Sequence, residues 1–318
     1  DEFDKEINVI REERLRSEDN PFDMLAEQLS ATAYQTHPYR NPIIGWMPDL
    51  YRIQKEDVVR WYRQWYAPNN AVLIIAGDVD PQHVFTLAEK YYGVYKPETL
   101  PTRFQLTDNP TAEGMRRIAL KHPQSKLPSI ALSYPVPALR NIQADDDVYA
   151  LSILAAVLSN DASSRLPKTL VRETQLARSA WASYSMFRRG PSLFWIGGSP
   201  SDGVSTEAFE TALRQELEKI AKEGVSEKEL SRIKTNIIAS QHYQRDALSS
   251  RANVIARLVM TGHPADGVDL ILEKLQAVTP AQVQAVAQKY FNPDLSTVAV
   301  LLPADSAEKP DNSSTQGQ

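Results

Sequence analysis

The chain has 318 residues, which exceeds one ordinary core and predicts about two domains at roughly 150 residues each. Hydrophobic residues make up 42% and charged residues 24%, so most of the chain is expected to fold. The net charge of −5 argues against a general nucleic-acid binder, and no apolar run reaches the roughly 18 residues that span a membrane. The absence of cysteine excludes disulfides, thiolate metal sites and cysteine nucleophiles.

The first 95 residues are predicted to be mostly helical. The Pro-rich segment 37–42 is expected to be a loop, and the apolar run 71–76 predicts a buried strand that Gly77 and Asp78 end. An aromatic stripe, interpreted as core or inter-helix packing, consists of Trp61, Tyr62, Trp65 and Tyr66. Helical spacing of apolar residues predicts helices over 1–16, 21–34, 55–66 and 81–92.

A linker over 96–114 is predicted because prolines recur there with little periodicity. It is followed by a second unit over 115–304 and a polar, flexible tail over 305–318. Strands followed by blocks of helices predict an α+β fold, an antiparallel-rich sheet with helices packed on one face. Strands are expected over 117–121, 129–134, 177–186, 193–197 and 295–302. Helices are expected over 147–158, 206–223, 227–243, 248–260, 269–275 and 280–289.

The sequence contains an internal repeat. An amphipathic helix, an aromatic pair, a proline and a strand-like run occur around Pro68 and again around Pro293, 225 residues later. His-Pro steps at 37 and 263 and Lys-Glu steps at 5 and 228 recur at offsets of 226 and 223. Such near-constant offsets predict two copies of one unit. The arithmetic makes the unit over 1–95 the C-terminal half of a copy, so apolar faces within it are expected to be exposed.

Glu6 and Glu13 are seven residues apart, so both carboxylates lie on one face of the first predicted helix. Two acids so placed can serve a cation, one as ligand and one behind it, although a solvated acidic face is the ordinary alternative. In the second copy, Glu6 is matched by Glu229, whereas Glu13 is matched by Asn236. The role of Glu13 is therefore expected to be confined to the first unit.

The segment from Glu6 to Glu13 resembles the Glu-x6-Glu helix of the M16 zinc metallopeptidases, the family of pitrilysin, insulinase and the mitochondrial processing peptidase. Further family signatures occur in the expected order over nearly the whole chain. They are His37-Pro38-Tyr39 with Pro42 and Gly45, Trp65 through Asp78, Ser164-Arg165-Leu166 with Leu170 through Ala177, and Gly224 through Leu230.

This resemblance implies tandem units of the LuxS/MPP-like type that face each other around a substrate chamber, the first of them incomplete here. It implies that Glu13 is a zinc ligand, that Glu6 supports it from behind, and that Arg172 grips the substrate backbone. A tyrosine that the family usually carries after that arginine is replaced by Arg178, with Tyr184 on the same predicted strand as an alternative substrate contact.

The zinc site implied by the resemblance is incomplete in this sequence. A zinc site needs about three protein ligands, and none of the five histidines belongs to a His-x-x-Glu-His motif. The two histidine ligands and the general base are therefore expected outside these residues, no catalytic residue is assigned, and the fragment by itself is expected to be inactive.

The resemblance implies a Zn2+-dependent endopeptidase that cleaves peptides or unfolded polypeptides. The alternative is a non-catalytic partner or scaffold subunit that binds polypeptide or completes a chamber with an active subunit. The two glutamates favour the enzyme, and the missing tyrosine favours the partner. A homodimer or heterodimer with another M16 subunit is compatible with either function; nucleic acid and a transmembrane segment are not expected. The sequence assigns no compartment, and only the family suggests a bacterial periplasm or envelope.

Overall fold

The computed structural model describes residues 2–104, 106–108 and 114–304, apart from the side chains of 241–246. Part of the predicted linker and the whole predicted tail over 305–318 lie outside the described residues. Within the described part, no helix combines the length and the apolar character needed to cross a membrane.

The segment before the linker contains no strand within its described residues, and its predicted helices are confirmed. α2 begins as the sequence indicates, because the Asn20 side chain accepts a hydrogen bond from the Phe22 amide and Pro21 occupies the first helical position. The elements are α1 (Glu2–Asp19), α2 (Pro21–Ala33), η1 (Pro38–Arg40), α3 (Met47–Leu50), α4 (Lys55–Trp65), η2 (Pro68–Asn70) and α5 (Pro81–Tyr92).

The second unit is built on a five-stranded sheet of order β1-β5-β2-β4-β3. Its strands are β1 (Arg116–His122), β2 (Ser129–Val136), β3 (Ala177–Tyr184), β4 (Ser192–Pro200) and β5 (Thr297–Pro303). Only the β1–β5 pair is parallel, and the other three pairs are antiparallel. The predicted α+β class with an antiparallel-rich sheet is therefore confirmed, with β1 and β3 as edge strands.

One face of the sheet carries the main hydrophobic core. Side chains such as Leu132, Phe194 and Ile196 meet Leu154 of α6 and Phe209 of α7 there. The helices and short turns of this unit are α6 (Asp146–Ser159), η3 (Pro167–Glu173, a π-helix), α7 (Thr206–Glu223), α8 (Glu227–Asp246), α9 (Leu248–Met260), α10 (Val268–Ala277), α11 (Pro280–Tyr290) and η4 (Pro293–Leu295).

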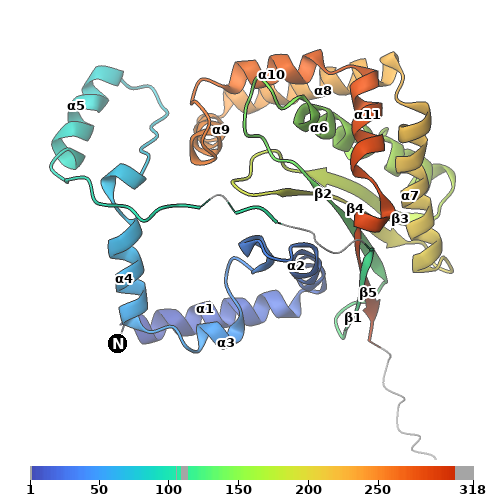
Figure 1. The fold of residues 1–318 in the computed structure, drawn as a ribbon, viewed down its shortest axis with the longest axis horizontal. Coiled ribbons are helices and arrows are strands. Elements are labelled where there is room, and N and C mark those ends of the chain that lie inside the picture. The colour runs from blue at the N-terminus through green and yellow to red at the C-terminus, as the bar shows by residue number, and fades with distance from the viewer. Residues whose placement is uncertain (1, 105, 109–113, 305–318) are drawn as a thin grey trace, which may run out of the picture.

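The other face of the same sheet is covered by α2, which comes from the segment before the linker (Figure 1). Leu25 and Leu29 are buried against Ala131, Ala299 and Leu301 of the central strands. An antiparallel sheet can leave one face in water, but here the first segment supplies the second layer. The two halves of the chain therefore share a core.

The internal repeat is visible in the structure. α4 and α11 are both 11 residues long, η2 and η4 are both three, and each pair is 225 residues apart. The copies differ at the next segment, where β5 pairs with β1 and β2 but residues 71–76 form no strand. The predicted buried strand over 71–76 is wrong: most of these residues are exposed, because no described strand offers them backbone partners.

Most of the aromatic stripe around α4 is exposed. Trp61 is 61% and Tyr66 is 72% exposed, and the ring contacts lie within the stripe, Trp61 to Trp65 at 5.5 Å and Tyr62 to Tyr66 at 4.7 Å between ring centres. Trp65 is half-buried, with the Arg103 guanidinium 5.1 Å from its ring centre. The interpretation of this stripe as core or inter-helix packing is therefore wrong for Trp61, Tyr62 and Tyr66. Figure 1 shows α4 and α5 apart from the sheet, so the expected exposed apolar faces are present.

Candidate functional site

The helix that carries both predicted metal-site acids is fixed by its opposite face. Ile7 and Arg14 of α1, themselves seven residues apart, are buried. The Arg14 guanidinium binds both carboxylate oxygens of Glu27 on α2, one at 2.8 Å, and donates to Glu18 at 2.9 Å. The hydrogen bond to Glu27 raises the pKa of Arg14 against the opposing effect of burial. This contact holds α1 on α2.

Glu6 and Glu13 both lie on the exposed side of α1. Within the described residues, their carboxylates take part in no side-chain hydrogen bond or ion pair, and no three His, Asp or Glu side chains are grouped so that they could hold a metal ion. The residues present thus do not fit a complete zinc site. Glu13 can supply one ligand, and its assignment, like that of Glu6, stays a prediction.

In the second copy, the side chains at the equivalent positions form hydrogen bonds that hold neighbouring elements together. Glu229, which matches Glu6, holds Arg165 through two hydrogen bonds of 2.9 and 2.8 Å. Asn236, which matches Glu13, donates to Asp161 at 2.9 Å. Both positions of α8 are therefore engaged with neighbouring elements, whereas the carboxylates of α1 are left facing solvent.

The two predicted substrate-binding arginines lie close together in sequence near the sheet edge formed by β3. Arg172 is exposed near the end of η3, a π-helical turn of a kind often found at functional sites. Arg178 is exposed on β3 and forms an ion pair with Asp202. Between them, Gln175 has a φ of 54°, a rare left-handed conformation for a side chain other than glycine. Within the described chain, neither arginine forms a hydrogen bond or ion pair with α1.

Tyr184, the alternative substrate contact, is already engaged. Its hydroxyl donates to the Pro137 carbonyl at 2.6 Å, and its ring stacks on Phe194. Burial raises the pKa of Tyr184 well above its ordinary value. This side chain stabilises the core and is not presented to a ligand.

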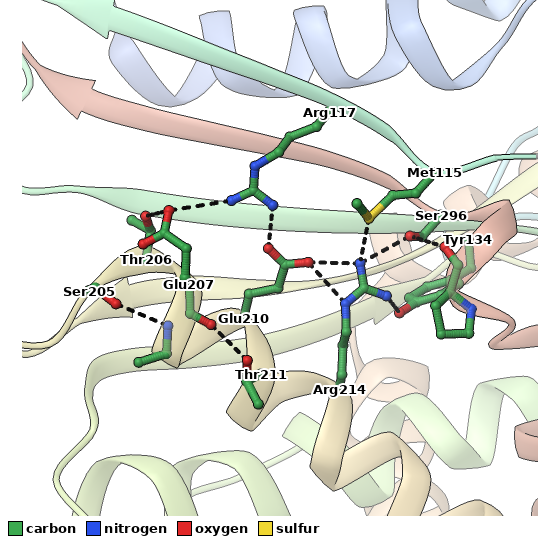
Figure 2. A network of polar contacts seen from close by, with 12 residues as sticks. Met115, Arg117, Tyr134, Ser205, Thr206, Glu207, Glu210, Thr211, Arg214 and Ser296 are labelled. Atoms are coloured by element: carbon green, nitrogen blue, oxygen red, sulfur yellow. Dashed lines mark hydrogen bonds and ion pairs between the residues drawn. The ribbon is translucent and has the colours of Figure 1, made fainter.

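The densest polar cluster joins β1 to α7 on the core face of the sheet (Figure 2). Glu210 is buried and accepts from Arg117 and from Arg214, the latter through two nitrogens at 3.0 and 2.8 Å. Arg214 also donates to the Tyr134 hydroxyl at 2.9 Å and to Ser296 at 3.1 Å. Because both arginines pair with the buried Glu210, this cluster has a structural role in joining β1 to α7.

The loop predicted over 37–42 is confirmed apart from the short turn η1, and its His37 has a structural role. Nδ1 of His37 accepts from the Tyr39 amide at 3.1 Å, and the ring lies edge-on to Tyr39 at 4.4 Å. Asp108 anchors the preceding turn by accepting from the amides of Thr36 and His37. This role of Asp108, which lies 71 residues beyond His37, has no sequence signal, whereas the burial of Arg14 could be inferred from its spacing to Ile7.

Comparisons with known proteins agree with this architecture. A family model described as the Peptidase M16 inactive domain matches residues 52–237. The zinc protease PqqE of Helicobacter pylori is 30% identical over 309 residues, which is 95% of this chain and 67% of that protein. The chain belongs to the M16 peptidase family. The predicted family resemblance is confirmed, and relatives in the family are named zinc proteases.

Solved structures show the same fold. The crystal structure of a protease from Helicobacter pylori superposes with a TM-score of 0.87 at 28% identity, covering 95% of this chain and 72% of that one. The periplasmic protease PqqL from Escherichia coli superposes with a TM-score of 0.76 at 17% identity, covering 94% of this M16 chain and 34% of that one. At that identity, PqqL supports the fold alone.

Proposed function

We propose that this M16 chain is part of a zinc-dependent endopeptidase that cleaves peptides or unfolded polypeptides. In this proposal, residues 1–95 are the C-terminal half of the catalytic unit, 96–114 a linker and 115–304 a non-catalytic unit. The family match and the relatives named zinc proteases support the reaction class.

The observation that carries the proposal is the presentation of Glu13. The adjacent Arg14 is buried and clamped by Glu27, so the helix is held while Glu13 points into solvent with its carboxylate unused by the described chain. An unpaired acid on a fixed helix is a suitable metal ligand, and Glu6, two turns earlier on the same side, can orient it. The engaged residues at the matching positions of α8 explain why the second unit would not share this role.

Glu13 by itself cannot retain zinc, because protein zinc sites use three or four ligands. The remaining ligands and the general base are proposed to come from residues other than these 318, on the same or another polypeptide. We therefore derive no chemical step from the residues in hand.

Arg172 and Arg178 are proposed to hold the substrate. Both are exposed, and Arg178 lies on the edge strand β3, whose outer backbone groups have no neighbouring strand in the described sheet. An extended polypeptide can bind such an edge by strand addition, with the guanidinium groups holding its carbonyls or acidic side chains. Arg178 would exchange its ion pair with Asp202 for the substrate at little cost, because exposed ion pairs contribute little to stability.

The test is a pair of variants of the gene product that carries these residues. Glu13→Gln is expected to reduce bound zinc and to abolish cleavage of an unstructured peptide, whereas Glu12→Gln, displaced by about 100° around the helix from Glu13, is expected to leave both nearly intact. Full zinc content and full activity in Glu13→Gln would overturn the assignment of Glu13.

A non-catalytic partner subunit is the second candidate. It is favoured by the match to a domain described as inactive and by the lack of a three-ligand cluster in the described residues. Such a subunit would carry no zinc of its own, and activity would appear only with a second M16 subunit and survive Glu13→Gln.

A homodimer or heterodimer with another M16 subunit is proposed for either function, and light scattering would test it. A periplasmic or envelope location is proposed from membership of the M16 family and is tested by cell fractionation.

A further inference from the structure

The α2 face of the sheet contains a cavity of about 220 Å³ beyond the C-terminal end of α2. Tyr34 lines it from the first half of the chain, and Arg116, Ser133, Leu193 and Thr297 line it from the strands of the second unit. Arg116 and Thr297 are register partners where the parallel strands β1 and β5 begin. The cavity thus lies at the junction of the two halves of the molecule.

Two of the residues that line this cavity have buried polar atoms without partners. Nε and Nη1 of Arg116 and Oγ of Ser133 are buried and form no hydrogen bond in the described structure. Ser133 is only 1% exposed. A buried polar group without a partner is costly and a charged one more so, and native proteins therefore rarely leave such groups unpaired.

The neighbouring residue on β1, Arg117, has the carboxylate partner that Arg116 lacks. Arg117 points to the opposite face of the sheet and meets the carboxylate of Glu210, as Figure 2 shows. Arg116 has the same side chain one position earlier, on the α2 face, but no carboxylate holds the two nitrogens that are buried there. Arg116 is therefore a half-buried cation with two unpaired nitrogens.

The lining and the size of the cavity indicate which class of anion would fit beside Arg116. A guanidinium pairs best with anionic oxygen, and the Ser133 hydroxyl can donate to the same group. The rest of the lining includes Pro135, Val136 and Leu193, which favour an aliphatic group over a second charged one. At roughly 30 Å³ for each water molecule, the volume equals about seven waters, enough for a carboxylic acid of a few carbons.

Asp108 also lines the cavity and limits the charge of a ligand. Its Oδ1 already accepts from the amide and hydroxyl of Thr36 at 2.8 and 3.1 Å and from the amide of His37 at 3.1 Å. Because Asp108 keeps its negative charge near Arg116, a dianion such as phosphate is disfavoured relative to a monoanion.

We propose that this cavity is a binding site for a small organic monocarboxylate. The carboxylate accepts from Arg116 and Ser133, and the aliphatic part packs against Pro135 and Leu193. The same chemistry is offered by a free acid and by the C-terminal carboxylate of a peptide. Because Tyr34 forms one wall, an occupied site also stabilises the contact between α2 and the sheet.

Isothermal titration of the 318-residue chain with N-acetyl-leucine and with its neutral amide tests the site without any substitution. The acid is expected to bind saturably and at least about tenfold more tightly than the amide, because only the acid satisfies the cation. A ten-residue peptide ending in leucine, with a free or an amidated C-terminus, separates the two sources. Tighter binding of the free-terminus peptide assigns the site to peptide ends, and binding of the small acid alone assigns it to free acids.

Matched variants locate the site. Arg116→Gln is expected to weaken binding of the acid about tenfold or more and Ser133→Ala about threefold, whereas Arg117→Gln, the same change on the opposite face of the strand, leaves binding unchanged. The proposal is overturned if the wild-type chain binds neither ligand, if acid and amide bind equally, or if Arg116→Gln retains the affinity for the acid.

Discussion

Arg14 of α1 and Glu27 of α2 form an ion pair that is almost removed from solvent, with 4% and 10% of their side chains exposed. The pair is bidentate, and the Arg14 guanidinium also lies 5.7 Å from the ring centre of Trp46. Since α2 packs on the sheet, this pair connects the helix that carries Glu13 to the core of the second unit.

Removing one partner of this pair is expected to destabilise the chain strongly. Arg14→Met leaves the Glu27 carboxylate buried without its cation, at a cost of about 3–5 kcal/mol. Arg60→Met removes an exposed ion pair with Asp57 and is expected to change the free energy of unfolding little, because solvent screens such a pair. The free energy of unfolding in urea measures both. Equal losses in the two variants would show that burial does not distinguish the pairs.

The internal repeat provides a second matched comparison. Phe291 lies 225 residues after Tyr66, but Phe291 meets Tyr134 and Phe194 at 4.9 and 4.8 Å between ring centres, whereas Tyr66 is exposed. Phe291→Ala is expected to cost about 2 kcal/mol or more, and Tyr66→Ala about 0.5 kcal/mol or less. Chemical denaturation of each variant provides the measurement. A large loss in Tyr66→Ala would mean that another surface covers α4 in solution.

Gly190, which lies just before β4, permits a close contact with the His37 loop. A Cβ at this position would lie 2.5 Å from two atoms of the His37 ring and 2.9 Å from the Tyr39 ring. Gly190→Ala is therefore expected to cost about 1–3 kcal/mol through overpacking. Gly77→Ala, whose Cβ would meet its nearest atom at 3.8 Å, serves as the control and should change the melting temperature little. If both glycine variants melt alike, the close contact is not present in solution.

The sequence predicted the helices and the five strands of the sheet well because their patterns are local. α4 and α11 follow from amphipathic spacing and an N-terminal cap, and the antiparallel-rich sheet follows from short apolar runs between turns. The segment 71–76 has the same local pattern as β5 yet forms no strand. A strand is defined by its partners, and a local pattern cannot tell whether partners are present.

Contacts over long sequence separations could not be predicted. The placement of α2 on the second sheet joins Leu29 to Ala299, and no periodicity in either segment indicates its partner. The same holds for Asp108 at the His37 turn and for the unpaired Arg116 beside the paired Arg117. Glu13 is a candidate metal ligand because its segment resembles a family motif, and the burial of Arg14 explains physically why the adjacent Glu13 faces outward.

Two buried histidines are expected to make the chain less stable in mild acid. Burial lowers the pKa of both His37 and His263, and the positive charge of Arg140 lowers both pKa values further. The negative charge of Asp108 opposes this shift at His37, and the Leu139 backbone and Asp145 oppose it at His263. Protonation of His37 would also remove the Nδ1 acceptor used by the Tyr39 amide.

The direction of the pH effect follows from linkage. Because each histidine has a lower pKa in the folded chain than its unfolded value of about 6.5, the unfolded chain takes up the proton first as pH falls. Stability should be complete above about pH 6.5 and should decline below it, by at most about 1.4 kcal/mol per pH unit for each histidine. Urea unfolding at pH 7.5 and 5.5 measures the decline. Two variants, His37→Asn, which keeps an acceptor near the Nδ1 position, and His263→Gln, should each reduce this loss of stability between pH 7.5 and 5.5. If both variants lose as much stability as the wild type, these histidines do not cause the decline.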